Sequence, residues 1–489
     1  MKPANNPKIV IVGSGVDLLQ SALAAAKSFS YANPSIIAVE VDGPEGPEVG
    51  ASFSDMASFH NLLGISEGAF IKGSLAGLNF GTELCLDGQS PGFVFSDGPY
   101  GFIIEGLGFH ELFGKVRGER PAVRYDDYCL SASLAKANRV APRSTKAKSI
   151  FSTVRYGYLF LRQRYYGYLN ALLQGHGVSI VRANSLTVEH VTTPSDSAPS
   201  ELGKHQISRV VINGEQALTA DLYIDCSQSR ALAANQLDAH KLEFVEPRFL
   251  APYRIHTHNE KCEKTTKRAS ARLMFTRDGW DQQVAHLDCQ STTSYQFLWQ
   301  GEFSRESNSS DYHMPAMMTQ AWSGNCVALG AACADIPNPL PGPYHLLQSQ
   351  LLLLFDVWTG GQLLDSARAV FNDFTAQLCR HNIDIANWLL HRHAQRPESF
   401  ELTPANRDRL QLFEASGAVR PVENAVIAAD HWAALLLASG YRQHGESLKS
   451  ASIGRDVALA QLDKLRELLA KATEAAEPYE KWLATNLNA

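Results

Sequence analysis

The sequence lacks several features that would assign it to a simple functional class. Its 489 residues carry a net charge of −6 at pH 7, which argues against a nucleic-acid partner held by phosphate contacts. No apolar run approaches the ~18 residues of a membrane-spanning helix, so we expect no membrane span. The eight cysteines show no CxxC or Cys/His ligand spacing, so we expect reduced thiols and no metal site. The absence of a signal-peptide hydrophobic region leads us to expect a cytoplasmic protein.

The most informative positive signal is the first strand and the turn that follows it. Residues 9–12 read Ile-Val-Ile-Val, glycines follow at Gly13 and Gly15, and the apolar run 36–39 ends at Glu40. A strand, a tight glycine turn, a helix and a second strand ending in an acid form the unit that binds the pyrophosphate and ribose of FAD or NAD. The helix N-terminus would supply N–H groups to phosphate, and Glu40 would accept hydrogen bonds from a ribose.

Further elements follow from periodicity and turn residues. Aromatic and leucine residues recur at helical spacing over 156–178, and a strand is predicted at 178–181. Residues 184–220 predict a small antiparallel insert with a hairpin turn. The segment 221–227 predicts a short buried strand that returns to the main sheet.

These elements predict an α/β fold with a FAD/NAD(P)-binding Rossmann-type core. We expect this core over residues 1–343, interleaved with a β-rich substrate-side subdomain at about 184–220 and 243–320. From residue 344 the pattern is almost entirely helical, which predicts a C-terminal helical subdomain over 344–489.

Two pairs of histidines could suggest a metal, namely His256 with His258 and His391 with His393. No third ligand with carboxylate spacing stands close to the first pair, so we interpret its members as exposed histidines. His391 follows an amphipathic helical pattern, and we interpret it as interacting with the dipole at the C-terminal end of that helix.

Several segments, taken in order, resemble the flavin-dependent tryptophan halogenase family. They are the Gly13 turn with Glu40, the loop 49–52 before Leu63-Gly64-Ile65, the segment 221–227 with Arg230, and the segments 322–330, 345–349, 410–417 and 478–482. The resemblance implies FAD as cofactor, held through Gly13, Gly15, Glu40, Gly50 and Gly330, and a flavin reductase as partner. It also implies that hypohalous acid made at the flavin reaches a lysine, with a glutamate nearby, which direct it onto an aromatic ring such as an indole.

The chain departs from the family at the residues that carry this chemistry. Asn79 stands at the lysine position, and asparagine can neither form a chloramine nor act as a cationic donor. The glutamate position holds Leu340, or Pro341 if the register slips by one residue. Of the family's W-x-W-x-I-P wall only Trp280 remains. We therefore identify no catalytic residue, and we expect Asn79, Trp280 and Pro341 to border the substrate pocket.

The expected flavin contacts are also changed. Leu18 occupies the third glycine position, where we expect its side chain to crowd the helix against the strand. The other substitutions lie in the flavin loop, after the Cys-Ser pair and near residue 160: Ala51, Gln228, Leu159 and Leu161. We therefore expect FAD binding to be weakened or lost.

Two functional hypotheses remain. In the first, the chain is a halogenase homologue unable to halogenate by the usual mechanism, which binds an aromatic small molecule or a partner protein. In the second, it is an active FAD-dependent halogenase or monooxygenase with relocated catalytic residues, for which Lys72 and Lys115 are candidate lysines. A homodimer is compatible with both hypotheses.

Overall fold

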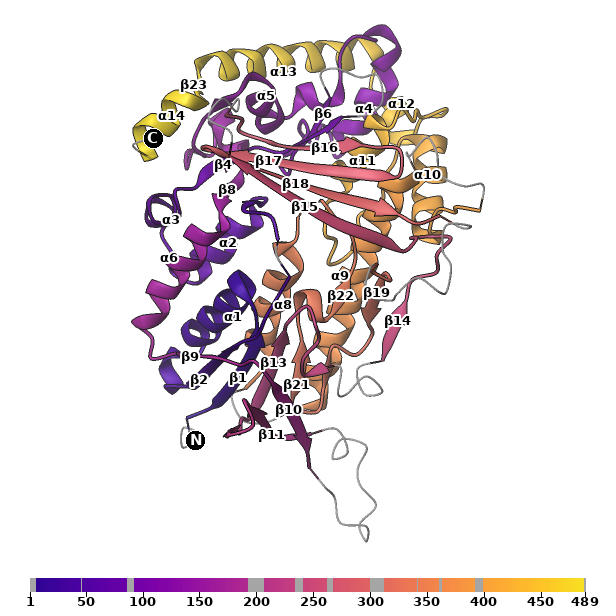
Figure 1. Ribbon diagram of the computed structural model, residues 1–489. Coiled ribbons are helices and arrows are strands. Elements are labelled where there is room, and N and C mark those ends of the chain that lie inside the picture. The colour runs from indigo at the N-terminus through magenta and orange to yellow at the C-terminus, as the bar shows by residue number, and fades with distance from the viewer. Residues whose placement is uncertain are drawn as a thin grey trace.

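The computed structural model describes residues 6–44, 46–85, 92–191, 206–233, 241–261, 267–299, 312–340, 342–359, 363–391 and 399–487. Figure 1 shows a Rossmann sheet near the N-terminus, a sheet of long strands beyond it, and helices from the C-terminal part of the chain alongside both.

The central sheet is the predicted Rossmann-type core, and the α/β prediction is confirmed. Its strands, in spatial order, are β20 (Trp322–Ser323), β21 (Cys326–Ala328), β13 (Leu222–Cys226), β1 (Lys8–Gly13), β2 (Ser35–Glu40) and β9 (Ser179–Arg182). Strand β13 returns between β1 and β21, parallel to both, as the segment 221–227 predicted. Side chains of β1 alternate between two apolar clusters, with Ile9 and Ile11 in one and Val10 and Val12 in the other. This sheet is therefore covered on both faces.

The predicted antiparallel insert is confirmed as a separate three-stranded sheet. It consists of β10 (Leu186–His190), β11 (Ile207–Ile212) and β12 (Gln216–Leu218). Apolar side chains of β11 pack with Val10 and Val12, so the insert covers one face of the Rossmann sheet.

A second six-stranded sheet forms a wall beyond the Rossmann core. Its strands, in spatial order, are β15 (Tyr253–Lys261), β18 (Cys289–Phe297), β17 (Gly279–His286), β16 (Ala271–Phe275), β5 (Thr82–Cys85) and β6 (Phe93–Phe95). Smaller sheets contain β3 (Val49–Ala51), β8 (Gly157–Leu161) and β4 (Gly77–Asn79); β14 (Leu242–Phe244), β19 (Ala316–Met318) and β22 (Ala334–Asp335); and β23 (Glu477–Pro478) with β7 (Arg139–Val140).

Helices surround these sheets, and those after residue 344 contact both halves of the molecule. They are α1 (Gly15–Ser28), α2 (Asp55–Leu62), α3 (Glu67–Ser74), α4 (Phe109–Val116), α5 (Leu130–Ala137), α6 (Arg162–Gln174), α8 (Tyr344–Val357), α9 (Asp365–His391), α10 (Pro404–Ser416), α11 (Ala429–Ala438), α12 (Leu448–Ser452), α13 (Arg455–Ala475) and α14 (Tyr479–Leu487). Helix α8 packs on α1 and α2, whereas α13 packs on α4 and α5 (Figure 1). None of the helices in the described ranges is long and apolar enough to cross a bilayer.

The helix predicted over 156–178 is wrong at its start. Residues 157–161 form β8, which pairs with β3 and β4, and α6 begins only at Arg162. Long-range pairing has overridden the helical spacing of the aromatic residues here. The strand predicted at 178–181 is present as β9.

The histidine pairs do not form metal clusters within the described residues. His256 and His258 lie on β15 at the edge of the wall. His391 ends α9, and its Nε2 lies 2.7 Å from the hydroxyl of Tyr441. His393 lies outside the described residues.

Candidate functional site

The turn between β1 and α1 keeps the backbone that a bound phosphate needs. Gly15 has φ +57°, and no atom lies within 4 Å of the place where a Cβ would stand. Space therefore remains open at the first N–H groups of α1, which carry the positive end of the helix dipole. Gly13 is needed for another reason, because a Cβ there would lie 2.4 Å from the Sγ of Cys226. We call Gly13, Ser14, Gly15 and Glu40 the dinucleotide turn.

Leu18 does not crowd α1 against β1, contrary to the expectation from the sequence. Its side chain is fully buried, and β1 stays paired with β2 and β13 through Gly13. The missing side chain of Gly13 provides the room, since the Leu18 Cβ lies 3.4 Å from the place of a Cβ at residue 13. A leucine at the third glycine position is thus compatible with the turn.

Glu40 ends β2 and is partly exposed. The phenol of Tyr166 on α6 donates to its carboxylate, with oxygen separations of 3.2 and 3.4 Å. Burial and the charge of Glu40 raise the pKa of Tyr166, so the phenol remains a donor. A ribose would have to share Glu40 with Tyr166.

A partly buried carboxylate at the start of α1 was missed by the sequence reasoning. Asp17 lies in the first turn of the helix, and burial raises its pKa while the charge of Arg162 lowers it. The guanidinium of Arg162 fills the space beside Gly46, where a Cβ would stand 2.2 Å from Nη1. An acid two residues after the second glycine was the signal in the sequence that could have revealed this feature.

The residues near this turn fit the adenosine half of FAD better than the flavin half. The open space at Gly15 suits a phosphate, and the carboxylate of Glu40 suits a ribose. Against this, the carboxylate of Asp17 lies at the same end of α1 and would repel the phosphate. Side chains cover Gly50 in the loop expected to hold the flavin. A Cβ on Gly50 would lie 2.8 Å from the Phe160 ring and 3.2 Å from the Tyr344 hydroxyl.

Gly330, the other expected cofactor contact, is held by the protein itself. It has φ +54°, and its N–H donates to Gln350 Oε1 at 2.7 Å. Because the residue is buried and its donor is taken, this glycine makes no free backbone contact toward a cofactor.

Asn79 is buried and locked by hydrogen bonds. It is 2% exposed, its Nδ2 donates to the carbonyl of Ser52 at 2.8 Å, and its Oδ1 accepts from the Gly81 N–H at 3.4 Å. The uncharged side chain therefore links β4 to the loop after β3 by a hydrogen bond. We call Asn79, Ser52 and the expected glutamate position, Leu340, the Asn79 site.

The segment expected to carry the glutamate approaches the same loop. Leu340 is fully buried, and its N–H donates to Asn338 Oδ1 at 3.1 Å. A Cβ on Gly342 would lie 3.5 Å from the carbonyl oxygen of Ala51, next to Ser52. The segment that follows Leu340 thus approaches the loop that bonds Asn79, and neither Asn79 nor Leu340 carries a charge. Pro341 lies outside the described residues.

The two candidate replacement lysines are placed elsewhere. Lys72 is exposed on α3. Lys115 is nearly buried, pairs with Glu446 at 3.0 Å, and donates to the carbonyls of Ser450 and Ile453 at 2.8 Å. Lys115 therefore ties α4 to the C-terminal helices and supplies no amine at the Asn79 site.

Trp280 lies in β17 and is fully buried. Its ring centre is 4.8 Å from that of Phe297 and 6.0 Å from that of Tyr295. Its indole Nε1 has no hydrogen-bond partner among the described residues. The tryptophan is thus part of the aromatic packing of the wall.

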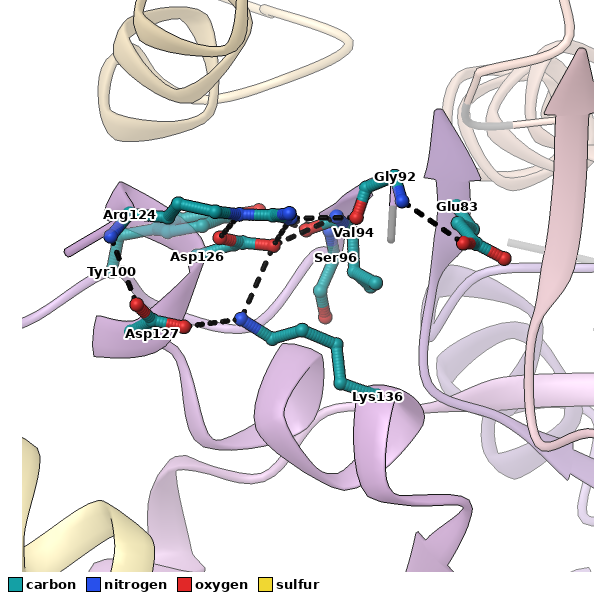
Figure 2. A network of polar contacts seen from close by, with 9 residues as sticks. All are labelled: Glu83, Gly92, Val94, Ser96, Tyr100, Arg124, Asp126, Asp127 and Lys136. Carbon is teal, nitrogen blue, oxygen red and sulfur yellow. Dashed lines mark hydrogen bonds and ion pairs between the residues drawn. The ribbon is translucent and has the colours of Figure 1, made fainter. Parts of the chain in front are cut away.

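A further carboxylate that the sequence reasoning missed, Asp97, follows β6. Its Oδ2 accepts from the N–H of Ser54 at 2.7 Å, and burial raises its pKa. The polar network in Figure 2 fixes this strand, because the fully buried Asp126 accepts from Val94 N–H at 2.9 Å and from Arg124 at 2.6 Å. The network therefore positions Asp97 next to the segment 52–54, which also bonds Asn79.

Two imidazole–carboxylate pairs add ionisable groups to this part of the molecule. Asp335 lies in β22 and its Oδ2 is 2.9 Å from His313 Nδ1. The other oxygen of Asp335 accepts from the hydroxyl of Tyr253. His345 Nδ1 lies 2.9 Å from Oδ2 of Asp55. The hydrogen bond to Asp335 raises the pKa of His313.

The comparisons with known proteins agree with this architecture. Residues 8–452 match the family model described as tryptophan halogenase. Similar solved structures include BrvH, a flavin-dependent halogenase from Brevundimonas sp. BAL3, with TM-score 0.86 and 18% identity over 99% of this chain and 100% of that chain. Xcc4156, a flavin-dependent halogenase from Xanthomonas campestris, gives a TM-score of 0.84 and 20% identity over 99% of this chain and 98% of that chain.

The tryptophan 6-halogenase SttH from Streptomyces toxytricini gives TM-score 0.78 and 19% identity over 98% of this chain and 99% of that chain. No curated protein sequence matches this chain. The match to the family model spans most of the chain, whereas the similar structures establish its fold. The chain therefore belongs to the tryptophan halogenase family.

Proposed function

We propose that this halogenase-family protein does not halogenate through a lysine and glutamate pair, and that it acts by binding a small aromatic molecule or a partner protein. The observation that carries the proposal is the buried amide of Asn79, which bonds the Ser52 carbonyl at the position where the resemblance leads us to expect the family's lysine. Leu340 adds a fully buried apolar side chain at the expected glutamate position. Neither residue can deliver an oxidant to a ring.

We further propose that FAD binds weakly or not at all. Gly15 and Glu40 favour binding, whereas the Asp17 carboxylate opposes a phosphate at the end of α1, and Phe160 covers Gly50. When bound in this family, FAD supplies the oxygen chemistry that generates the halogenating species. In this chain Glu40 would orient the ribose, and the N–H groups of α1 would hold phosphate.

The test is a halogenation assay combined with an FAD titration. The protein is incubated with FAD, a flavin reductase, NADH, bromide and indole, and products are identified by mass spectrometry. We expect no bromoindole above the level made without the protein. Bromoindole made by the unaltered chain would overturn the proposal. The Asn79→Lys, Leu340→Glu double variant, tested in parallel, would reveal whether the pocket still orients indole.

The alternative is an active FAD-dependent halogenase or monooxygenase with relocated catalytic residues. The pairs His313–Asp335 and His345–Asp55 favour it, because each holds an imidazole ready for proton transfer. A protein that purifies yellow and consumes NADH and oxygen with indole present would support this alternative.

A further inference from the structure

A cavity of about 400 Å³ lies between α2, the start of α3 and β8. Gly157 of β8 stands opposite Asn79 in register, and Tyr158 stands opposite Leu78. Because neighbouring side chains in a strand point to opposite faces, Tyr158 projects away from the face that carries Asn79. The cavity, which Tyr158 lines, is therefore separate from the Asn79 site and lies behind the small sheet.

Two arginines without ion-pair partners line this cavity. Neither Arg143 nor Arg155 forms an ion pair in the described part of the chain, and Arg143 is exposed. Nη1 of Arg155 donates to the carbonyls of Ser152 and Val154, both at 3.0 Å, which holds the guanidinium in place. Burial, and then the neighbouring charge of Arg143, lower the pKa of Arg155, whereas the charge of Asp97 has a smaller, opposite effect. The two guanidinium groups therefore lie close enough to repel each other, and Asp97 offsets this repulsion only in part.

The acidic residue that lines the cavity does not neutralise these cations. Glu67 accepts from the hydroxyl of Tyr158 at 3.0 Å and from the hydroxyl of Tyr156 at 3.4 Å. Its partners among the described residues are these two phenols, and it forms no ion pair with Arg143 or Arg155. With two guanidinium groups and one carboxylate that is already bonded, the lining carries a positive charge.

A buried imidazole provides a second and independent sign of a ligand site. His60 lines the cavity and is 2% exposed. Its Nε2 lies 2.7 Å from the hydroxyl of Tyr165, while its Nδ1 has no hydrogen-bond partner among the described residues. Burial lowers the pKa of His60 to about 3, so the ring is neutral at pH 7. An unpartnered buried nitrogen is costly unless a ligand or water bonds it.

We propose that this cavity binds a small organic anion, whose carboxylate or phosphate oxygens are held by Arg143 and Arg155 and whose body lies against Tyr156 and Tyr158. Guanidinium groups bind both oxyanions through paired N–H donors. A cavity of about 400 Å³ is large enough for a ligand with one or two rings. The inference is independent of the proposed function, because none of these four residues belongs to the dinucleotide turn or the Asn79 site.

Calorimetric titration of the full chain tests this proposal. The probes are benzoate, phenyl phosphate and inorganic phosphate, and benzamide serves as the uncharged analogue of benzoate. We expect saturable binding of at least one anion and none of benzamide. Preference for benzoate would identify a carboxylate ligand. Preference for phenyl phosphate over inorganic phosphate would identify an organic phosphate. No saturable anion binding up to about 10 mM would overturn the proposal.

Three variants locate the binding. Arg143→Gln and Arg155→Gln should each weaken anion binding by about tenfold or more. Arg209→Gln should leave it unchanged, since Arg209 is an exposed residue of β11 paired with Glu189 at 2.7 Å. The side chain of Arg143 makes no hydrogen bond or ion pair with the described residues, so its replacement keeps the test valid if Arg155→Gln fails to fold. Unchanged affinity in Arg143→Gln would overturn the assignment of the anion to this cavity.

Discussion

The dinucleotide turn and the Asn79 site lie in one fold and depend on different parts of the chain. The turn depends on backbone: a glycine at φ +57°, a close approach of β13 to Gly13, and free N–H groups at the start of α1. The Asn79 site would depend on side-chain charge, and its two key positions hold an amide and a leucine. Backbone features survive many substitutions because packing maintains them, whereas a charged pair is lost with a single residue.

The strongest test of this contrast is to return a lysine to position 79. Asn79 is 2% exposed and bonds two backbone groups, so Asn79→Lys would bury an ammonium without a counter-ion. We expect a loss of about 3–5 kcal/mol in the free energy of unfolding, measured by urea denaturation. The control is Asn79→Met, because methionine is similar in length to lysine but carries no charge, so it separates the effect of size from that of charge. A lysine variant as stable as the unaltered chain would mean that the site still accepts an ammonium.

The glycines of the turn should respond in two distinct ways. Gly13→Ala would place a Cβ 2.4 Å from Cys226 Sγ, and we expect it to lower the free energy of unfolding by about 2 kcal/mol. In Gly15→Ala the new Cβ would contact no neighbouring group, so only the positive φ is unfavourable. We expect it to lower the free energy of unfolding by about 1 kcal/mol.

Adding Cys226→Ala should rescue the Gly13 variant and leave the Gly15 variant unchanged. Equal effects of Cys226→Ala on both glycine variants would contradict the proposed origins. The measurement is thermal or urea unfolding of the two glycine variants, each with and without Cys226→Ala.

Removing the carboxylate of Asp17 should strengthen FAD binding. The charge lies in the first turn of α1, where a phosphate would bind. We expect Asp17→Asn to raise FAD affinity about tenfold, equivalent to roughly 1.4 kcal/mol, measured by fluorescence quenching. Asp42→Asn is the matched control, because Asp42 is exposed and pairs with Arg182 at 3.0 Å. No gain for Asp17→Asn would show that Asp17 does not oppose the phosphate.

The same residue predicts a pH dependence with a definite sign. Burial raises the folded-state pKa of Asp17 above the unfolded value, so protonated Asp17 favours the folded state. That contribution is fully present below the unfolded pKa and is lost as pH rises through the folded pKa. Asp17→Asn should therefore gain stability relative to the unaltered chain as pH rises through this range. An unchanged difference across the range would contradict the raised pKa.

The smallest expected effect concerns the other end of the turn. Tyr166 donates to Glu40 and competes with a ribose for it. Tyr166→Phe should raise FAD affinity by about threefold, or roughly 0.6 kcal/mol. The same titration with riboflavin, which lacks the adenosine, should show no change. Weaker FAD binding in Tyr166→Phe would mean that the phenol itself contacts the nucleotide.

Local patterns predicted much of the Rossmann core, because β1, its glycine turn and Glu40 are encoded within a few dozen consecutive residues. The insert with β11 was predicted for the same reason. Strand β8 was mistaken for helix because its partners, β3 and β4, lie far from it in sequence.

The assignment of Asn79 and Leu340 to the catalytic positions rests on the resemblance and stays a prediction. The fold adds that Asn79 bonds Ser52 and that Gly342, two residues after Leu340, approaches the neighbouring Ala51. The acid at position 17 was visible in the sequence, but its pairing with Arg162 and the Asp97–Ser54 hydrogen bond were not, because each joins residues from different elements. Leu18 was misjudged, since the space that receives it is created by Gly13 on the neighbouring strand.

The position of β13 in the central sheet also has consequences for synthesis of the protein. Strand β1 is made first, yet one of its two neighbours, β13, begins at Leu222. While the ribosome translates the intervening segment, β1 has an apolar edge with unpaired N–H and carbonyl groups. Such an edge is prone to pair with other chains. Nascent chains of this protein should therefore depend on chaperones until β13 has emerged.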